Sequence, residues 1–273
     1  MKEFERVGGT GFLILLFYFL ILVFMLIVEP GNLAVTENDF TLLGAGNGTP
    51  VKIVFISDIH AGLQKAGWLD NAVDRVNGQE PDIILLGGDY IESDASELEK
   101  LAPLGRLRAP YGIYAVLGNH DYGDWGCGED DGTAGKVEAG LESLGADVLR
   151  NEHELLDVRG RGFALIGVDE LWACRDDYPA AANGTDGMPK IILAHNLKAV
   201  NPDSISGRAL VLSGHTHCGL IRLPVLTELV LGTRPIGGRA ALDGDTDAYV
   251  TCGVTGGGVR LLTNPEISVI TIK

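Results

Sequence analysis

The chain has 273 residues, 46% of them hydrophobic, and its 37 acidic residues outnumber 21 basic ones for a formal net charge of −16. This length predicts one large α/β domain with a short additional segment. A chain this acidic should be repelled by the phosphate backbone of DNA or RNA, and we therefore do not expect nucleic acid as a partner. An anionic substrate would instead need a local positive centre, such as a metal cluster.

The first apolar feature is an uncharged run at residues 12–28, FLILLFYFLILVFMLIV. As a helix it would be roughly 26 Å long, at the lower end of what crosses a bilayer. We predict a short tail at residues 1–10 and a single-pass transmembrane anchor at 11–28. A buried core helix and a cleavable signal peptide are the alternatives, but the run is apolar on every face and no small-x-small cleavage site follows it directly.

The basic residues around this run indicate its orientation. Lys2 and Arg6 precede it, and residues 29–51 contain neither lysine nor arginine. The positive-inside rule then places the N-terminus in the cytoplasm and the large domain outside it. We expect residues 29–50 to be a linker, because residues 43–50 are rich in Gly, Asn and Thr.

In residues 51–273, the expected catalytic domain, short apolar runs alternate with helical patterns. Strands are expected at 51–57, 82–86, 111–117, 163–168, 191–194, 210–213, 249–254 and 267–272, and helices at 68–77, 96–107 and 136–144. This alternation predicts a sheet covered by helices. Polar clusters follow several strands, at the edge where open α/β sheets gather their sites.

Five such clusters contain residues that bind metals. They are Asp58-Ile59-His60, Gly88-Asp89, Gly118-Asn119-His120-Asp121, Ala194-His195-Asn196 and Gly214-His215-Thr216-His217. A lone Asp after a strand is usually a turn or cap residue, and a lone His is usually a satisfied polar group. Five clusters, each at a strand end, favour a shared site. Their carboxylate, imidazole and amide groups suit divalent Mn, Fe or Zn.

The order D-x-H, G-D, G-N-H-D, H, G-H-T-H resembles the calcineurin-like metallophosphoesterase family over residues 51–273. The C-terminal region resembles that of small bacterial membrane-associated members of the YkuE/YaeI type. Those members often continue G-H-T-H-G-G-Q, whereas this chain has Cys218-Gly219-Leu220. The resemblance implies a four-layer αββα sandwich, two divalent ions, and no organic cofactor.

The resemblance also implies roles for individual residues. The first ion would be held by Asp58, His60 and His217. The second would be held by Asn119, His195 and His215. Asp89 would bridge the two ions, with a hydroxide between them as the nucleophile. His120 would stabilise phosphoryl oxygens or protonate the leaving group, and Asp121 would orient its imidazole.

These features predict a metal-dependent phosphoesterase that hydrolyses a phosphodiester or phosphomonoester, with a phosphorylated small molecule or lipid as its substrate. The anchor favours a membrane-associated or envelope substrate. A second enzymatic hypothesis is that the protein is a UDP-2,3-diacylglucosamine-type pyrophosphohydrolase of lipid A synthesis. That activity would require the domain to lie in the cytoplasm. The non-enzymatic alternative is a scaffold that keeps the fold without catalysis, although none of the expected ligands is missing.

Three weaker signals remain open. The four cysteines form no CxxC pair. A disulfide between Cys127 and Cys174 would require an extracytoplasmic domain. We expect Cys218 to be merely a small residue beside His217. The loop at 124–135 is either a lid or a solvated surface loop. Three arginines after the last histidines either bind a substrate phosphate or are surface charges. They are Arg222, Arg234 and Arg239.

Overall fold

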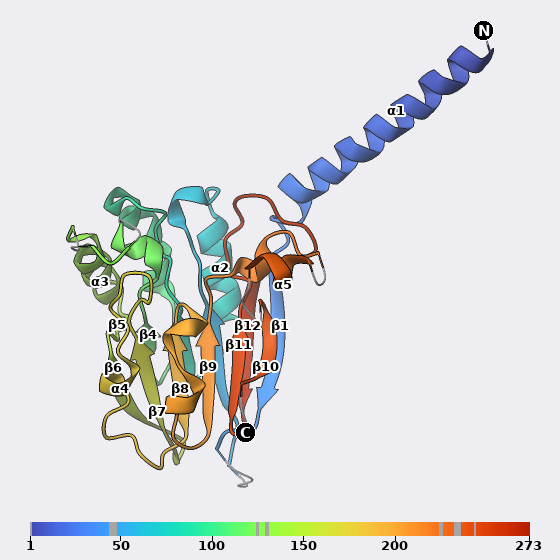
Figure 1. Cartoon of the computed structure of the whole chain (residues 1–273). Helices are drawn as coiled ribbons and strands as arrows, with labels where there is room; N and C mark the ends of the chain where they lie inside the picture. The colour runs from blue at the N-terminus through green and yellow to red at the C-terminus, as the bar shows by residue number, and fades with distance from the viewer. Residues whose placement is uncertain are drawn as a thin grey trace.

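Two stacked β-sheets form the centre of the molecule in the computed structural model, which describes residues 2–43, 48–123, 126–128, 131–223, 226–231, 236–242 and 244–273 (Figure 1). Within these ranges, each sheet has six strands, in the orders β1-β12-β2-β3-β4-β5 and β10-β11-β9-β8-β7-β6. The first sheet contains β1 (Ala34–Phe40), β2 (Val51–Ile56), β3 (Ile83–Leu86), β4 (Ile113–Ala115), β5 (Asp147–Val148) and β12 (Glu266–Ile272). The second contains β6 (Glu152–Val158), β7 (Arg161–Val168), β8 (Lys190–Ala194), β9 (Ala209–Ser213), β10 (Gly238–Ala241) and β11 (Thr246–Val250).

Helices cover the outer face of each sheet. The first sheet is covered by α2 (Trp68–Asn77), α3 (Thr133–Ser143) and the 3₁₀ helix η3 (Ala95–Arg106). The second is covered by α4 (Tyr178–Ala181) and the short turn η5 (Leu197–Ala199). The other short helices are η2 (Ala61–Leu63), η4 (Asn119–Tyr122), η6 (Pro202–Ser204), η7 (His217–Gly219) and α5 (Leu226–Leu231). The predicted four-layer αββα sandwich is confirmed.

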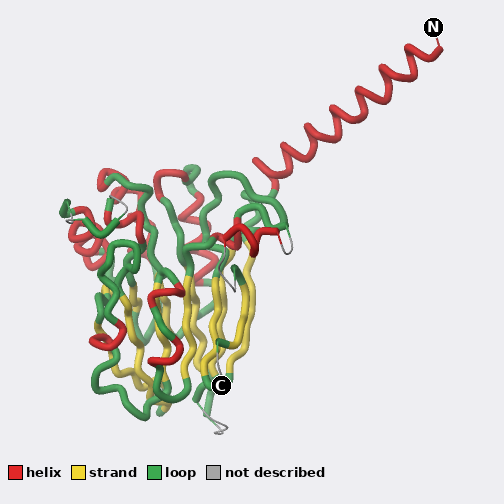
Figure 2. Tube along the Cα trace, in the orientation of Figure 1, coloured by secondary structure: helices red, strands yellow, loops and turns green. Residues whose placement is uncertain are grey.

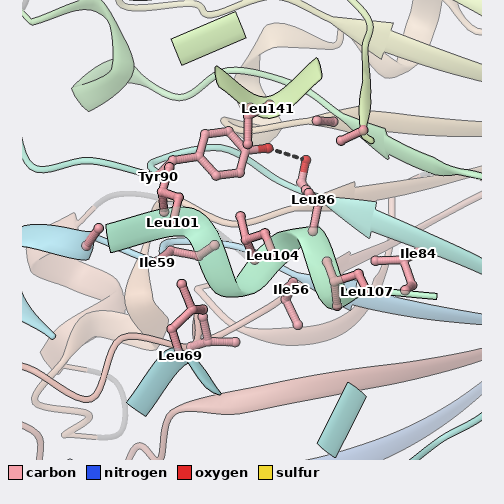
Figure 3. Packing of buried hydrophobic residues seen from close by; sticks show 14 of the residues in the cluster. Ile56, Ile59, Leu69, Ile84, Leu86, Tyr90, Leu101, Leu104, Leu107 and Leu141 are labelled. Atoms are coloured by element: carbon pink, nitrogen blue, oxygen red, sulfur yellow. Dashed lines mark hydrogen bonds between the residues drawn. The ribbon is translucent and has the colours of Figure 1, made fainter. Parts of the chain in front are cut away.

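Side chains of β2 show why the central strands appear as continuous apolar runs. Ile53 and Phe55 point into the core between the two sheets. Val54 and Ile56 point the opposite way, into the core under the helices. Figure 3 shows this second core, where Ile56 lies near Leu104 of η3. Both faces of the strand are therefore buried, as in sheets covered on both sides.

The apolar helix stands apart from this sandwich. It consists of α1 (Lys2–Val23) and a π-helical continuation, η1 (Phe24–Val28), and it projects away from the domain (Figures 1 and 2). Residues 11–28 are long and apolar enough to cross a membrane, and none of them is buried.

The expected linker at residues 29–50 is wrong in part. Ala34–Phe40 forms β1, which pairs in parallel with β12 from Ala34 opposite Glu266 to Phe40 opposite Ile272. β1 carries polar and acidic side chains because it lies at the edge of the sheet, where one side of the strand is open to water. Residues 44–47 of the expected linker lie outside the described residues.

Candidate metal centre

The predicted ligands gather at one end of the sandwich. Asp58 and His60 follow β2, Asp89 follows β3, and Asn119 follows β4, all in the first sheet. His195 follows β8, and His215 and His217 follow β9, in the second sheet. Within each set the strands run parallel, and their carboxyl ends therefore share one edge. Stacking of the two sheets brings both sets of loops together.

The first group of side chains that could hold a metal ion consists of Asp58, His60, Asp89 and His217. One ligand atom of each lies within 4.8 Å of the others. Nε2 of His60 lies 3.2 Å from Nε2 of His217 and 3.6 Å from Oδ2 of Asp89. Nε2 of His217 lies 3.4 Å from Oδ1 of Asp58. Two carboxylates and two imidazoles thus converge on one point.

The second group consists of Asp89, His195 and His215, again with ligand atoms within 4.8 Å. Nε2 of His195 lies 3.1 Å from Oδ2 of Asp89. Nδ1 of His215 lies 2.9 Å from Oδ1 of Asn119, which adds the amide oxygen to this group. Asp89 belongs to both groups, so its carboxylate lies between them.

Five of these side chains sit on strained backbone. Asp58, His60, Asp89, His215 and His217 have φ between 48° and 68°. Residues other than glycine rarely adopt such values, and the structure around functional sites often imposes them. The strain helps to turn successive side chains of each loop toward the centre.

Two glycines in the motifs are required by close approach of the loops. A Cβ on Gly88 would lie 2.6 Å from the backbone nitrogen of Gly118 and 2.8 Å from Nδ1 of His195. A Cβ on Gly214 would collide with Ser57 and Asp58. The glycines before Asp89 and His215 therefore let the two sheets meet at the site.

The hydrogen bonds of Asp121 differ from those expected. Its carboxylate accepts backbone N–H groups of Asp89 at 2.9 Å, Tyr90 at 2.8 Å and Gly118 at 2.8 Å. Burial and the charge of Asp89 raise the pKa of Asp121 to about 7. Asp121 thus ties the loop after β3 to the loop after β4, rather than orienting the imidazole of His120 as predicted.

His120 lies beside the first ligand group. Its backbone N–H donates to Oδ1 of Asp89 at 3.0 Å, and its ring centre is 4.7 Å from that of His60. Its Nδ1 lies 2.5 Å from the carbonyl oxygen of Glu92, which can only accept, so Nδ1 carries the hydrogen. Nδ1 therefore keeps its hydrogen, and a proton exchanged by this ring would pass through Nε2.

The protonation states of several side chains at the centre suit a bound cation. Burial lowers the pKa of His215 and of His217 to about 4, so both imidazoles are neutral near pH 7. Burial alone would raise the pKa of Asp89, but His195 lowers it below its usual range and keeps the carboxylate ionised. Although burial lowers the pKa of His195, Asp89 raises it above its usual range, so this pair holds a proton when no metal ion is bound. A bound cation would displace that proton, because metals bind neutral imidazole and ionised carboxylate.

The contact between His195 and Asp89 also tests whether these residues suit a metal ion. Nδ1 of His195 lies 2.7 Å from the carbonyl oxygen of Gly87 and donates to it. A neutral imidazole then presents a lone pair at Nε2, which faces a carboxylate oxygen at 3.1 Å. Two acceptors this close need a proton or a metal ion between them. Nε2 of His195 has no hydrogen-bond partner among the described residues, as expected of a ligand atom.

Sequence reasoning missed two side chains that border the centre. Oε2 of Glu92 lies 2.9 Å from Nδ1 of His60, and Oε1 lies 4.0 Å from Nδ1 of His120. The ring of Trp172 stands at 90° to that of His215, with centres 4.4 Å apart. Neither residue belongs to a ligand motif, and the only sequence signal for Glu92 was its place three residues after Asp89.

Two disulfides flank the centre. Cys127–Cys174 forms, and it ties the loop after the Asn119 block to the segment that carries Trp172. Cys218–Cys252 also forms, so the expectation that Cys218 is merely a small residue is wrong. Its partner is distant in the sequence and becomes its neighbour only when β9 and β11 pair. Of the loop at 124–135, residues 124, 125, 129 and 130 lie outside the described residues.

Of the three arginines after the last histidines, the structure describes Arg222 and Arg239. Arg239 pairs with Asp247 at 2.8 Å, and its guanidinium lies 4.5 Å from the centre of the Phe40 ring. These contacts give Arg239 a structural role at the edge of the second sheet. Arg222 is exposed, and Arg234 lies outside the described residues.

Comparisons with known proteins agree with this geometry. Residues 51–219 match the family model described as calcineurin-like phosphoesterase. Phosphodiesterase YaeI of Escherichia coli (strain K12) is 32% identical over 238 residues, covering 83% of each chain. The uncharacterized metallophosphoesterase YkuE of Bacillus subtilis (strain 168) is 30% identical over 260 residues, covering 90% of this chain and 87% of that protein.

Two further matches extend these comparisons. A transmembrane protein with a metallophosphoesterase domain from Danio rerio is 33% identical over 246 residues; the match covers 82% of this chain and about half, 53%, of that protein. The solved structure of phosphopantetheinyl hydrolase PptH from Mycobacterium tuberculosis superposes with a TM-score of 0.50 at 13% identity, over 74% of this chain and 89% of that one. The sequence matches place this chain in the calcineurin-like phosphoesterase family.

Proposed function

We propose that this protein is a membrane-anchored phosphoesterase that uses two divalent ions to hydrolyse a phosphodiester or phosphomonoester of a membrane-associated substrate. The observation that carries the proposal is the position of Asp89 in both ligand groups. A carboxylate shared in this way can join two cations at the short separation, roughly 3.5–4 Å, that two-metal phosphoesterases use. The relative YaeI is named a phosphodiesterase, which supports the diester reaction.

We assign the seven ligands as the motifs indicate. Asp58, His60 and His217 would hold one ion, and Asn119, His195 and His215 the other. Such ions lower the pKa of a water molecule and polarise phosphoryl oxygens. The metal identity is one of Mn, Fe or Zn, which the mixed oxygen and nitrogen donors suit.

The remaining residues would position the substrate and move protons. When water attacks phosphorus, the P–O bond to the leaving group breaks and the leaving oxygen needs a proton. His120, when protonated on both ring nitrogens, can deliver that proton from Nε2, because the carbonyl oxygen of Glu92 holds the hydrogen on Nδ1. Trp172 borders the second ligand group and offers an apolar face to the leaving group.

We further propose that α1 is the anchor, with the N-terminus in the cytoplasm and the domain outside. The two disulfides support this orientation, because disulfides persist in oxidising compartments. They also argue against the pyrophosphohydrolase alternative, which needs a cytoplasmic domain. A C-terminal alkaline phosphatase fusion, active only after export, should be active, and a matching GFP fusion should be dark; the reverse pattern would refute the orientation.

The enzymatic proposal is tested on the full chain, purified in detergent and reconstituted with Mn²⁺, Fe²⁺ or Zn²⁺. We expect two ions per chain by elemental analysis, and hydrolysis of an aryl phosphodiester or monoester. A panel of phospholipids and nucleotide-linked lipids would then identify the substrate class. Two bound ions without hydrolysis of any aryl phosphate would instead support a scaffold.

A further inference from the structure

Exposed apolar side chains gather in one part of the domain. Among the described residues after the apolar helix, ten large apolar side chains are exposed, and seven of them lie within residues 220–230 or at Leu262. Single exposed leucines are ordinary, whereas a gathered patch marks a surface that meets a partner or a membrane. We use the name apolar rim for Leu220, Leu226, Leu229, Val230 and Leu262. Leu229 and Val230 of α5 are 75% and 74% exposed.

The two segments of the rim are held together by backbone hydrogen bonds. Ile221 and Leu261 form an isolated parallel bridge. The N–H of Leu261 donates to the carbonyl oxygen of Leu220 at 2.8 Å, and the N–H of Arg222 donates to that of Leu261 at 2.8 Å. Leu262 therefore belongs to the same surface as the segment that leads into α5.

The apolar rim is joined directly to the end of the anchor helix. The N–H of Arg260 donates to the carbonyl oxygen of Met25 in η1 at 3.0 Å. The N–H of Thr263 donates to Oε1 of Glu29 at 2.6 Å, and Glu29 is only 5% exposed. The segment carrying Leu262 thus forms the joint with the helix, and Figure 1 shows α5 close to the point where the helix leaves the domain.

The metal centre lies at this same end of the sandwich. β1 begins at Ala34, opposite Glu266 of β12, and β12 runs antiparallel to β2. The anchor therefore meets the domain beside the carboxyl end of β2, where Asp58 follows. The rim also touches the site itself, because the N–H of Leu220 donates to the carbonyl oxygen of His217 at 3.1 Å.

We propose that the apolar rim inserts into the interfacial layer of the bilayer that holds α1, so that the metal centre faces the lipid surface and takes its phosphoester from a lipid headgroup. This rests on the proposed membrane-anchored phosphoesterase. Apolar side chains on a short surface helix bind at the boundary between headgroups and acyl chains. The rim would hold the domain down on the membrane, whereas the helix alone would only tether it.

The depth of a tryptophan side chain in the bilayer tests directly whether the apolar rim inserts. Full-length Leu229→Trp is reconstituted in phosphatidylcholine–phosphatidylglycerol vesicles with or without brominated acyl chains, which quench tryptophan on contact. The matched control is Leu155→Trp, 57% exposed on β6 at the opposite edge of the second sheet from β10. We expect brominated lipid to reduce the fluorescence added by Trp at 229 roughly two-fold and that added at 155 hardly at all. Equal emission with both lipids at position 229 would overturn the proposal.

A second variant tests the consequence for catalysis. Serines at Leu226, Leu229 and Val230 together should lower the hydrolysis of a vesicle-borne phosphodiester roughly ten-fold. The hydrolysis of a soluble aryl phosphodiester and the metal content should be unchanged. Unchanged hydrolysis of the vesicle substrate would count against the rim. So would a dimer of the parent chain that the serines dissociate, because the rim would then bind a second copy. A parent chain that hydrolyses neither substrate would defeat the phosphoesterase proposal, while the quenching result would still decide the rim.

Discussion

Oδ2 of Asp89 lies 3.1 Å from Nε2 of His195, although Asp89 follows a strand of the first sheet and His195 a strand of the second. The contact depends on Gly88, since a Cβ there would lie 2.8 Å from Nδ1 of His195. It is the point where the two halves of the sandwich share one polar centre. Changes at Asp89 should therefore affect both ligand groups together.

Asp89→Asn should remove most metal binding and most activity. The amide keeps the shape of the side chain but loses the charge that two cations would share. We expect fewer than two ions per chain and a loss of turnover greater than roughly 100-fold. Elemental analysis and aryl phosphodiester kinetics measure both, with the exposed Asp203→Asn as control. Two retained ions at normal affinity would show that Asp89 does not bridge them.

His120→Ala should separate metal binding from catalysis. The imidazole lies beside the ligands, and a general acid contributes typically 100- to 10,000-fold to the rate, so we expect turnover to fall by about that factor. Metal content should be unchanged. His153→Ala is the control, because His153 lies on β6 outside the ligand motifs. Intact turnover in His120→Ala would exclude His120 as the proton donor.

Glu92→Gln should weaken the metal centre through His60. Oε2 of Glu92 lies 2.9 Å from Nδ1 of His60, and a carboxylate in this position orients the ring and makes it a better ligand. We expect metal affinity to fall about 10- to 100-fold, with turnover recovered at saturating metal. Titration against a chelator measures the affinity, and Glu154→Gln on β6 is the matched control. An unchanged affinity would mean that Glu92 serves only His120.

The two disulfides should have different consequences when removed. Cys218 directly follows His217, so serines at Cys218 and Cys252 should loosen that ligand and lower the free energy of unfolding by about 3 kcal/mol. Added metal should stabilise this double variant less than it stabilises the parent, as shown by the shift in Tm. Serines at Cys127 and Cys174 should leave metal binding unchanged and raise KM, because that bridge positions the segment of Trp172. Identical behaviour of the two double variants would contradict these separate roles.

The central strands and the ligand motifs could be predicted from the sequence. All eight expected strands exist, because a strand buried on both faces, such as β2 or β8, is a continuous run of apolar residues. The ligand types and their places after strands were also evident, because each metal-binding motif is local in the sequence.

Only the tertiary structure decided the rest. The four strands that sequence reasoning missed are the edges of the two described sheets: β1, β5, β6 and β10. An edge strand has one open side and needs no apolar run, so its identity depends on a distant partner, as β1 depends on β12. The same reason applies at the site. Asp121 holds two loops, Glu92 approaches His60, and Cys218 meets Cys252 through contacts that exist only once distant strands have paired.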